Sequence, residues 1–167
     1  METTLGDLRV MQDEKARTLS YFCTEETLVI DEQVIKQLVE ESQKRNNCDV
    51  RICLHNSPSE KLHNMIILQN KGRYCRPHKH LDKYETYHLI KGKMAFISFD
   101  ETGAVTEIRM LNSDTKNIIR VGPNKWHASV PLTRRIIFHE ARTGPFLQGD
   151  SVFPTWAPDG SDSHKAK

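Results

Sequence analysis

The sequence predicts an all-β fold, an antiparallel sandwich or barrel, preceded by a short segment with strands and one helix. Nine short apolar runs follow residue 48, turn residues separate them, and no helical pattern comes between them. Strands of four to eight residues at such spacing are typical of antiparallel sandwiches and barrels. The chain of 167 residues is long enough for one such domain and too short for two well-cored ones.

Residues 1–47 are the predicted N-terminal extension, which we expect to pack on the barrel. Residues 16–30 are rich in Thr, Tyr, Phe and Val and predict one or two short strands. A helix follows, with Asp31 as a suitable N-cap and apolar residues at helical spacing. Glu40 and Lys44 form a favourable pair four residues apart on its polar side.

Residues 48–147 are the predicted barrel, and residues 148–167 an irregular tail. The nine strand candidates are DVRICLH, HNMIILQ, RYCRPHKH, TYHLIKG, KMAFISF, VTEIRML, NIIRVG, HASVPL and RRIIFHEA. Prolines interrupt regular structure after residue 144, and the last ten residues are polar. We expect His164, in this tail, to be inert.

The composition excludes several classes of protein. Lys plus Arg is 24 and Asp plus Glu is 22, so the net charge of +2 argues against a nucleic-acid binder. No apolar run is long enough for a membrane-spanning helix, and the N-terminus lacks an apolar signal-peptide core. The four cysteines have no C-x-x-C spacing and are expected to be reduced thiols. We therefore expect a cytoplasmic protein.

The segment from residue 72 to residue 92 carries the chemistry. His78 and His80 lie two residues apart on a predicted strand, so both point to one face. Glu85 opens the next strand and can lean toward the same point, and His127 follows a Gly-Pro-Asn turn. Imidazole and carboxylate suit one divalent transition metal, such as Fe, Mn, Ni, Co, Cu or Zn.

These residues resemble the motifs of the cupin superfamily. The first cupin motif is matched in full by Gly72-x5-His78-x-His80-x4-Glu85-x6-Gly92. The second motif is matched in part by Gly122-Pro123-Asn124-Lys125-Trp126-His127. The resemblance implies the cupin double-stranded β-helix, a jelly-roll barrel, with His78, His80, Glu85 and His127 as metal ligands.

Residues 48–140 are also similar to the WbuC family of cupin-fold metalloproteins. The matching features are Arg51-x-x-Leu54-His55, His63-Asn-Met65, Tyr74-x-Arg76-Pro77-His78-Lys-His80, Glu85 and Phe99-Asp-Glu-x-Gly103. Members occur in bacterial gene sets for O-antigen and other surface polysaccharides. The resemblance implies a sugar or nucleotide-sugar ligand in O-antigen or lipopolysaccharide biosynthesis.

Strand parity nominates further pocket residues, each with an ordinary alternative. Tyr74 and Arg76 share the face of His78, and Arg76 either binds an anionic substrate group or pairs with a surface acid. Tyr87 is either a proton donor or a core aromatic residue. Trp126 either stacks on a sugar or base or simply packs.

Four other histidines have no assigned role. His55 and His63 are either partners of the ligands or structural residues, and His88 is expected to face outward. His139 precedes Glu140 on the last predicted strand, where it could orient a ligand imidazole.

Three functions are compatible with the sequence. The first is an enzyme in which the metal polarises a substrate oxygen, with an iron dioxygenase as a variant. The second is a non-catalytic module that binds a carbohydrate or another small molecule. The third is a structural metal in an inert barrel. We expect a homodimer, because cupins often pair through sheet edges.

Overall fold

The computed structural model describes residues 2–16, 18–147 and 149–160 of the chain. Its one helix, α1, spans Glu32–Lys44. The strands in the described ranges are β1 (Glu2–Leu5), β2 (Leu8–Gln12), β3 (Leu19–Cys23), β4 (Val50–Cys53), β5 (Leu62–Asn70), β6 (Glu85–Lys91), β7 (Lys93–Phe99), β8 (Val105–Asn112), β9 (Ile118–Val121), β10 (Trp126–Pro131) and β11 (Arg135–Thr143).

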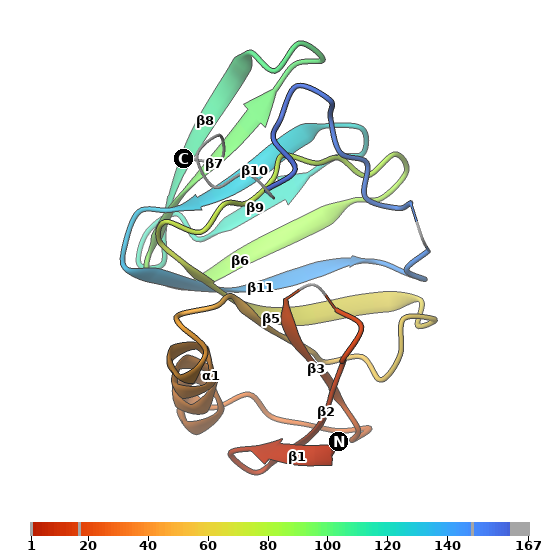
Figure 1. Ribbon diagram of the computed structural model, residues 1–167, viewed down its shortest axis with the longest axis vertical. Helices are drawn as coiled ribbons and strands as arrows, with labels where there is room; N and C mark the ends of the chain where they lie inside the picture. The colour runs from red at the N-terminus through yellow and green to blue at the C-terminus, as the bar shows by residue number, and fades with distance from the viewer. Residues whose placement is uncertain (1, 17, 148, 161–167) are drawn as a thin grey trace.

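The strands form two sheets (Figure 1). The larger has eight strands in the order β1-β2-β3-β4-β5-β11-β6-β9, and the smaller has three in the order β10-β7-β8. Neighbouring strands are antiparallel, except that β3 pairs with β4 in parallel. The predicted all-β fold, with the strands arranged in two sheets, is thereby confirmed.

The helix connects β3 to β4, as a parallel pair of strands requires a crossover. It begins where expected, because the Asp31 side chain accepts a hydrogen bond of 2.9 Å from the Val34 amide. The expected pair of Glu40 with Lys44 is an electrostatic interaction only, since the Glu40 charge raises the pKa of Lys44. The direct ion pair of Lys44 is with Glu41, three residues earlier, at 2.7 Å.

Eight of the nine strand candidates after residue 48 are strands, and the ninth, residues 73–80, is not. This segment makes only isolated bridges, His78 with His127 and Lys79 with Val152. Pro77 has no N–H to give a ladder, so pairing begins only at the residue after it. The sequence also gave no sign of β1 and β2, which form a hairpin at the N-terminus.

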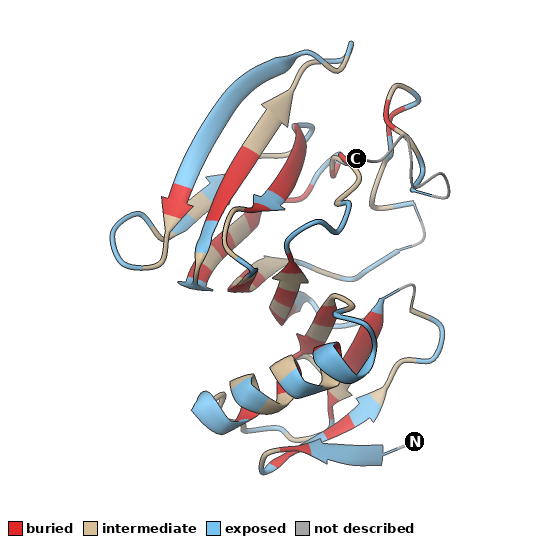
Figure 2. Ribbon diagram, turned by 60° about the vertical axis from the view of Figure 1, so that its left-hand side comes forward, coloured by how far each residue is buried: buried red, intermediate tan, exposed pale blue. Residues whose placement is uncertain are grey.

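Two apolar cores hold the sheets. The first lies between α1 and β1 to β5, and the second lies between the two sheets, around Tyr87, Leu89, Phe96 and Phe138. Burial alternates along strands such as β6 and β5, as one-sided packing requires (Figure 2). The second core supports the candidate site, because Tyr87 and Phe96 contact His127.

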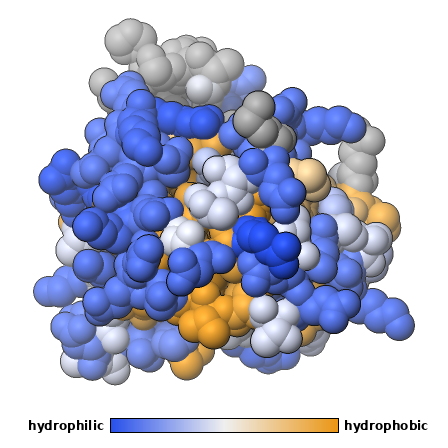
Figure 3. Space-filling view, turned by 90° about the horizontal axis from the view of Figure 1, so that it is seen from below, coloured by the Kyte–Doolittle hydropathy of each residue, from blue (hydrophilic) through white to orange (hydrophobic). Residues whose placement is uncertain are grey.

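The surface over the N-terminal elements, seen from below, is mostly hydrophilic with a hydrophobic area near its centre (Figure 3). In the described residues, α1 is far too short and polar to cross a membrane. All four cysteines are free, namely Cys23, Cys48, Cys53 and Cys75.

The packing of α1 predicts a large effect of truncating its buried face. Leu38 is fully buried in the first core. Leu38→Ala is expected to lower the free energy of unfolding by about 2–5 kcal/mol, because it leaves a cavity. Urea denaturation measures the change. Lys36→Ala, on the exposed side of the same helix, is the control, with an expected change of about 0.5 kcal/mol or less. Equal effects in both variants would contradict the packing described.

Candidate metal centre

Three parts of the chain bring the predicted ligands together. His78 and His80 lie on the segment before β6, Glu85 is the first residue of β6, and His127 is the second residue of β10. The backbones of His78 and His127 exchange two hydrogen bonds of 2.9 and 3.0 Å. The turn before β10 contains Asn124 at φ 57°, and its amide donates to the carbonyl of His80 at 2.6 Å. Backbone hydrogen bonds therefore fix the positions of the Cα atoms of His78, His80 and His127 relative to one another.

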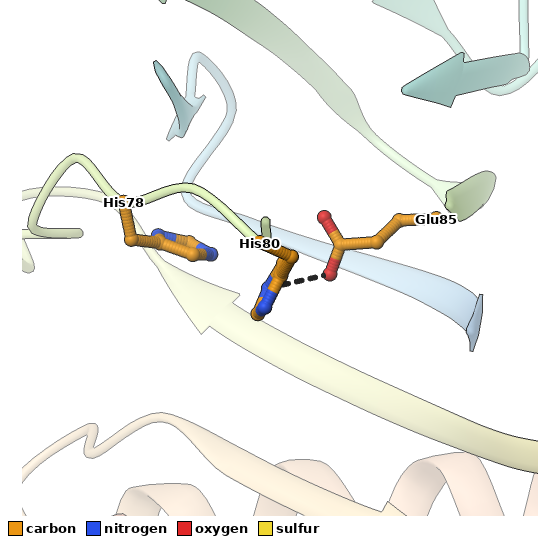
Figure 4. A group of neighbouring side chains, drawn as sticks. All are labelled: His78, His80 and Glu85. Atoms are coloured by element: carbon orange, nitrogen blue, oxygen red, sulfur yellow. Dashed lines mark ion pairs between the residues drawn. The ribbon is translucent and has the colours of Figure 1, made fainter. Parts of the chain in front are cut away.

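The side chains of these residues converge. His78, His80 and Glu85 each offer a ligand atom, and the three atoms lie within 4.8 Å of one another. The two rings and the carboxylate approach one another in Figure 4. His80 Nε2 lies 3.0 Å from Glu85 Oε1, and His127 Nε2 lies 3.1 Å from Glu85 Oε2. The structure thus gathers the three predicted histidine ligands around the buried carboxylate of the fourth, Glu85.

Backbone carbonyls fix the tautomer of each imidazole. A carbonyl can only accept, so a ring nitrogen bonded to one must carry the proton. The Nδ1 atoms bond in this way, His78 to the Arg76 carbonyl at 3.1 Å, His80 to that of Asp150 at 2.8 Å, and His127 to that of Lys125 at 2.8 Å. Each Nε2 therefore presents its lone pair to the centre, as metal-binding imidazoles do.

This arrangement fits a cation. With Nδ1 protonated, the lone pair of His80 Nε2 faces a carboxylate oxygen of Glu85 only 3.0 Å away. Both atoms are buried and make no hydrogen bond within the described part of the chain. Buried polar atoms are nearly always satisfied, so the pair needs a proton or a metal ion. Three imidazoles and one carboxylate are a donor set for a first-row divalent metal.

The pKa values follow from the same contacts. Burial raises the pKa of Glu85, but His127 and His80 outweigh burial and hold the pKa well below its usual range. Burial lowers the pKa of His80, yet the Glu85 carboxylate raises it above 6.5 overall. Burial, with the neighbouring His127, lowers the pKa of His78 to about 4. The centre thus holds one negative charge and an imidazole that binds a proton when no metal competes.

Tyr87, the candidate catalytic residue, lies at this centre. Its hydroxyl is 3.4 Å from Glu85 Oε2 and 3.4 Å from His127 Nε2. Burial and the Glu85 charge raise the pKa of Tyr87 well above 10, so the phenol keeps its proton at neutral pH. Phe96 stacks on the ring of His127 with centroids 5.3 Å apart and closes the centre on that side.

Tyr74 and Arg76, the candidate substrate-binding residues, contact the C-terminal segment. Arg76 donates to the carbonyl of Pro154 at 3.0 Å and lies 5.1 Å from the ring centroid of Phe153. The Tyr74 hydroxyl donates to the carbonyl of Pro158 at 3.0 Å. These two side chains hold the segment beside His78, whose ring centroid is 6.1 Å from that of Phe153.

Trp126, the third candidate, precedes His127 on β10 and points to the other face of the small sheet. Its Nε1 donates to Glu101 Oε2 at 2.8 Å, and Lys79 Nζ lies 4.4 Å from a ring centroid. Trp156 packs edge-on against it. The side chain is buried by these contacts.

The remaining histidines bond away from the four ligands. His55 and His63 stack on each other with centroids 4.0 Å apart, and each donates a ring N–H to a backbone carbonyl. His139 contacts the side chain of Asn64 at 3.0 Å, and His88 is half-buried beside it in the sheet. His164 lies outside the described residues.

Sequence reasoning missed two contributors. Arg142 lies 3.8 Å from Glu85 Oε1 and 3.9 Å from the buried Glu140, because β11 pairs in register with β6. Asp150 supplies the carbonyl that orients His80 and also forms an ion pair with the buried Lys83. The available signal was the pair Glu140 and Arg142 near the end of β11, but the sequence did not determine which face of the strand they occupy.

A family model described as a domain of unknown function (DUF6016) matches residues 30–111. The matched range contains His78, His80 and Glu85 and ends before His127. No curated protein matches the chain significantly.

Solved structures with similar folds include oxalate decarboxylases. That of Bacillus subtilis, described with Mn(II) centres, has 15% identity and a TM-score of 0.46 over 56% of this chain and 24% of its own. That of Lactobacillus farciminis has 13% identity and a TM-score of 0.46, over 56% and 27%. An uncharacterized conserved protein with a double-stranded β-helix domain from Klebsiella pneumoniae has 12% identity and a TM-score of 0.47, over 57% and 72%. The chain spans about a quarter of the length of the Bacillus subtilis enzyme.

The protonation of His80 predicts how metal affinity depends on pH. Because the Glu85 carboxylate raises the pKa of His80 above its usual value, a proton occupies the metal-free site as pH falls through that raised pKa. Metal must displace this proton, so the affinity for Mn(II) is expected to fall about tenfold per pH unit below the pKa of His80. Titration of the metal-free protein at several pH values measures it. An affinity that does not change as pH falls through the pKa of His80 would contradict the assignment.

Proposed function

We propose that this chain is a mononuclear divalent-metal cupin whose ion is held by His78, His80, Glu85 and His127. The observation that carries the proposal is the set of Nδ1 hydrogen bonds to backbone carbonyls, which turns the Nε2 lone pairs toward one carboxylate. Three imidazoles and one carboxylate leave an open position for a small molecule, unlike a closed structural site.

The ligand we propose is oxygen-rich, a sugar or nucleotide-sugar. The support for this is the resemblance of residues 48–140 to the WbuC family, which also suggests O-antigen biosynthesis. When bound, the ion supplies Lewis-acid polarisation of a carbonyl or hydroxyl oxygen. We assign Tyr87 as the proton donor, because its hydroxyl lies beside the ligands and keeps its proton.

Metal content tests the proposal. The protein purified without added metal is expected to contain about one iron, manganese, nickel or zinc per chain by elemental mass spectrometry. His80→Ala is expected to lose this metal while its circular dichroism is unchanged, since the barrel has its own apolar core. His139→Ala is the matched control and is expected to retain the metal, because His139 bonds to Asn64. Equal metal content in the three proteins would contradict the site.

Tyr87→Phe separates an enzyme from a binding module. The variant removes one hydroxyl whose contacts are long, so metal content and ligand affinity are expected to stay the same. Sugar isomerisation, if the wild type catalyses it, is expected to slow by about 10²–10⁴-fold when the proton donor is lost. A wild type that binds a sugar but never converts it would favour the non-catalytic alternative. Stoichiometric iron would direct the assay to oxygen consumption instead.

A further inference from the structure

A second concave site lies at the far end of the barrel. β6 starts at the ligand Glu85 and ends six residues later at Lys91, about 20 Å away at the usual rise per residue. Three connections meet at this far end, namely β6–β7 at Gly92, β8–β9 at Ser113 and β10–β11 at Thr133. In Figure 1 these turns gather at the left of the barrel, above α1.

Hydrogen bonds fix these connections to one another. The Ser113 amide donates to the carbonyl of Gly92 at 3.1 Å, and the Lys93 amide donates to Thr133 Oγ1 at 3.1 Å. Thr133 Oγ1 donates in turn to the carbonyl of Arg135 at 2.8 Å. Gly92 has φ +95°, and a Cβ there would lie 2.6 Å from Thr133 Oγ1. The turns therefore form a rigid floor that only glycine permits at this position.

The floor lines a shallow, open groove of about 560 Å³. Its lining residues are polar or charged, and none of them is aromatic. Base recognition in single strands relies on aromatic stacking, which this groove cannot provide. The groove therefore suits a compact polar ligand better than an unstacked nucleic acid.

The groove carries an excess of positive charge. Lys91, Lys93, Arg134 and Arg135 line it, and none of the four makes an ion pair within the described residues. The only acid in the lining is Asp114, whose carboxylate accepts a bond from the neighbouring Ser113 hydroxyl. Burial and the adjacent Arg134 lower the pKa of Arg135, as expected for cations held together. This concentration contrasts with a chain whose net charge is only +2.

We propose that this groove binds a small molecule that carries two or three adjacent phosphate groups. Two lysines flank Gly92 and two arginines follow Thr133, and all four line the same groove. One phosphate neutralises only part of this charge, whereas a diphosphate or triphosphate can contact cations from both turns. The inference is independent of the metal centre, which lies at the other end of β6.

Calorimetric titration with inorganic pyrophosphate at physiological salt tests the proposal. The wild type is expected to bind it, and orthophosphate is expected to bind at least about tenfold more weakly. Lys93→Gln with Arg134→Gln is expected to raise the Kd for pyrophosphate at least about tenfold, because each charged contact contributes strongly. Lys36→Gln with Lys61→Gln removes the same charge from exposed positions outside the groove and is expected to change the Kd less than twofold.

Pyrophosphate also binds divalent metals, so the titration is repeated with His80→Ala. The affinity is expected to be unchanged there, which keeps this inference separate from the fate of the metal proposal. Loss of binding in His80→Ala would assign pyrophosphate to the metal centre and overturn the proposal. The same holds for no binding to the wild type, for equal weakening in the two double variants, or for a single-stranded oligonucleotide that binds where pyrophosphate does not.

Discussion

The buried carboxylate of Glu85 is the constraint on which the centre of this protein depends. Its side chain is 2% exposed, and an isolated charge in such surroundings costs several kcal/mol. His80 and His127 each approach one of its oxygens, and the guanidinium of Arg142 lies 3.8 Å from Glu85 Oε1. Since Nδ1 of each histidine is committed to a carbonyl, the lone pairs of Nε2 face the carboxylate, and a proton on His80 or a metal ion satisfies the contact.

The C-terminal segment of the chain helps to build the site around Glu85. Asp150 orients His80 through its carbonyl, and Val152 bridges to Lys79, so the segment after β11 completes the centre. Arg76 fixes the same segment from the other side by bonding to Pro154. The site is therefore assembled from the segment before β6, the start of β10 and the C-terminal segment. The opposite end of the barrel is built from tight turns and carries unpaired cations instead.

Local patterns predicted much of this molecule, and contacts distant in sequence account for the rest. The spacing from His78 to Glu85 and the turn before His127 were enough to predict four residues that do meet. The helix cap at Asp31 was predictable because it involves neighbours three residues apart. Residues 73–80 misled because their alternation resembles a strand, while Pro77 blocks the ladder. The role of Asp150 could not be predicted, because its backbone carbonyl bonds to His80 and every residue type has such a carbonyl.

The central claim is that the three Nε2 atoms and Glu85 share one ion, and X-ray absorption of the Co(II)-loaded protein tests it most directly. We predict that three imidazole nitrogens and one carboxylate oxygen lie at about 2.0–2.2 Å from the metal. His127→Ala is expected to lose one imidazole from this shell, and His88→Ala is expected to lose none. A metal shell without imidazoles, or one that His127→Ala leaves unchanged, would contradict the account.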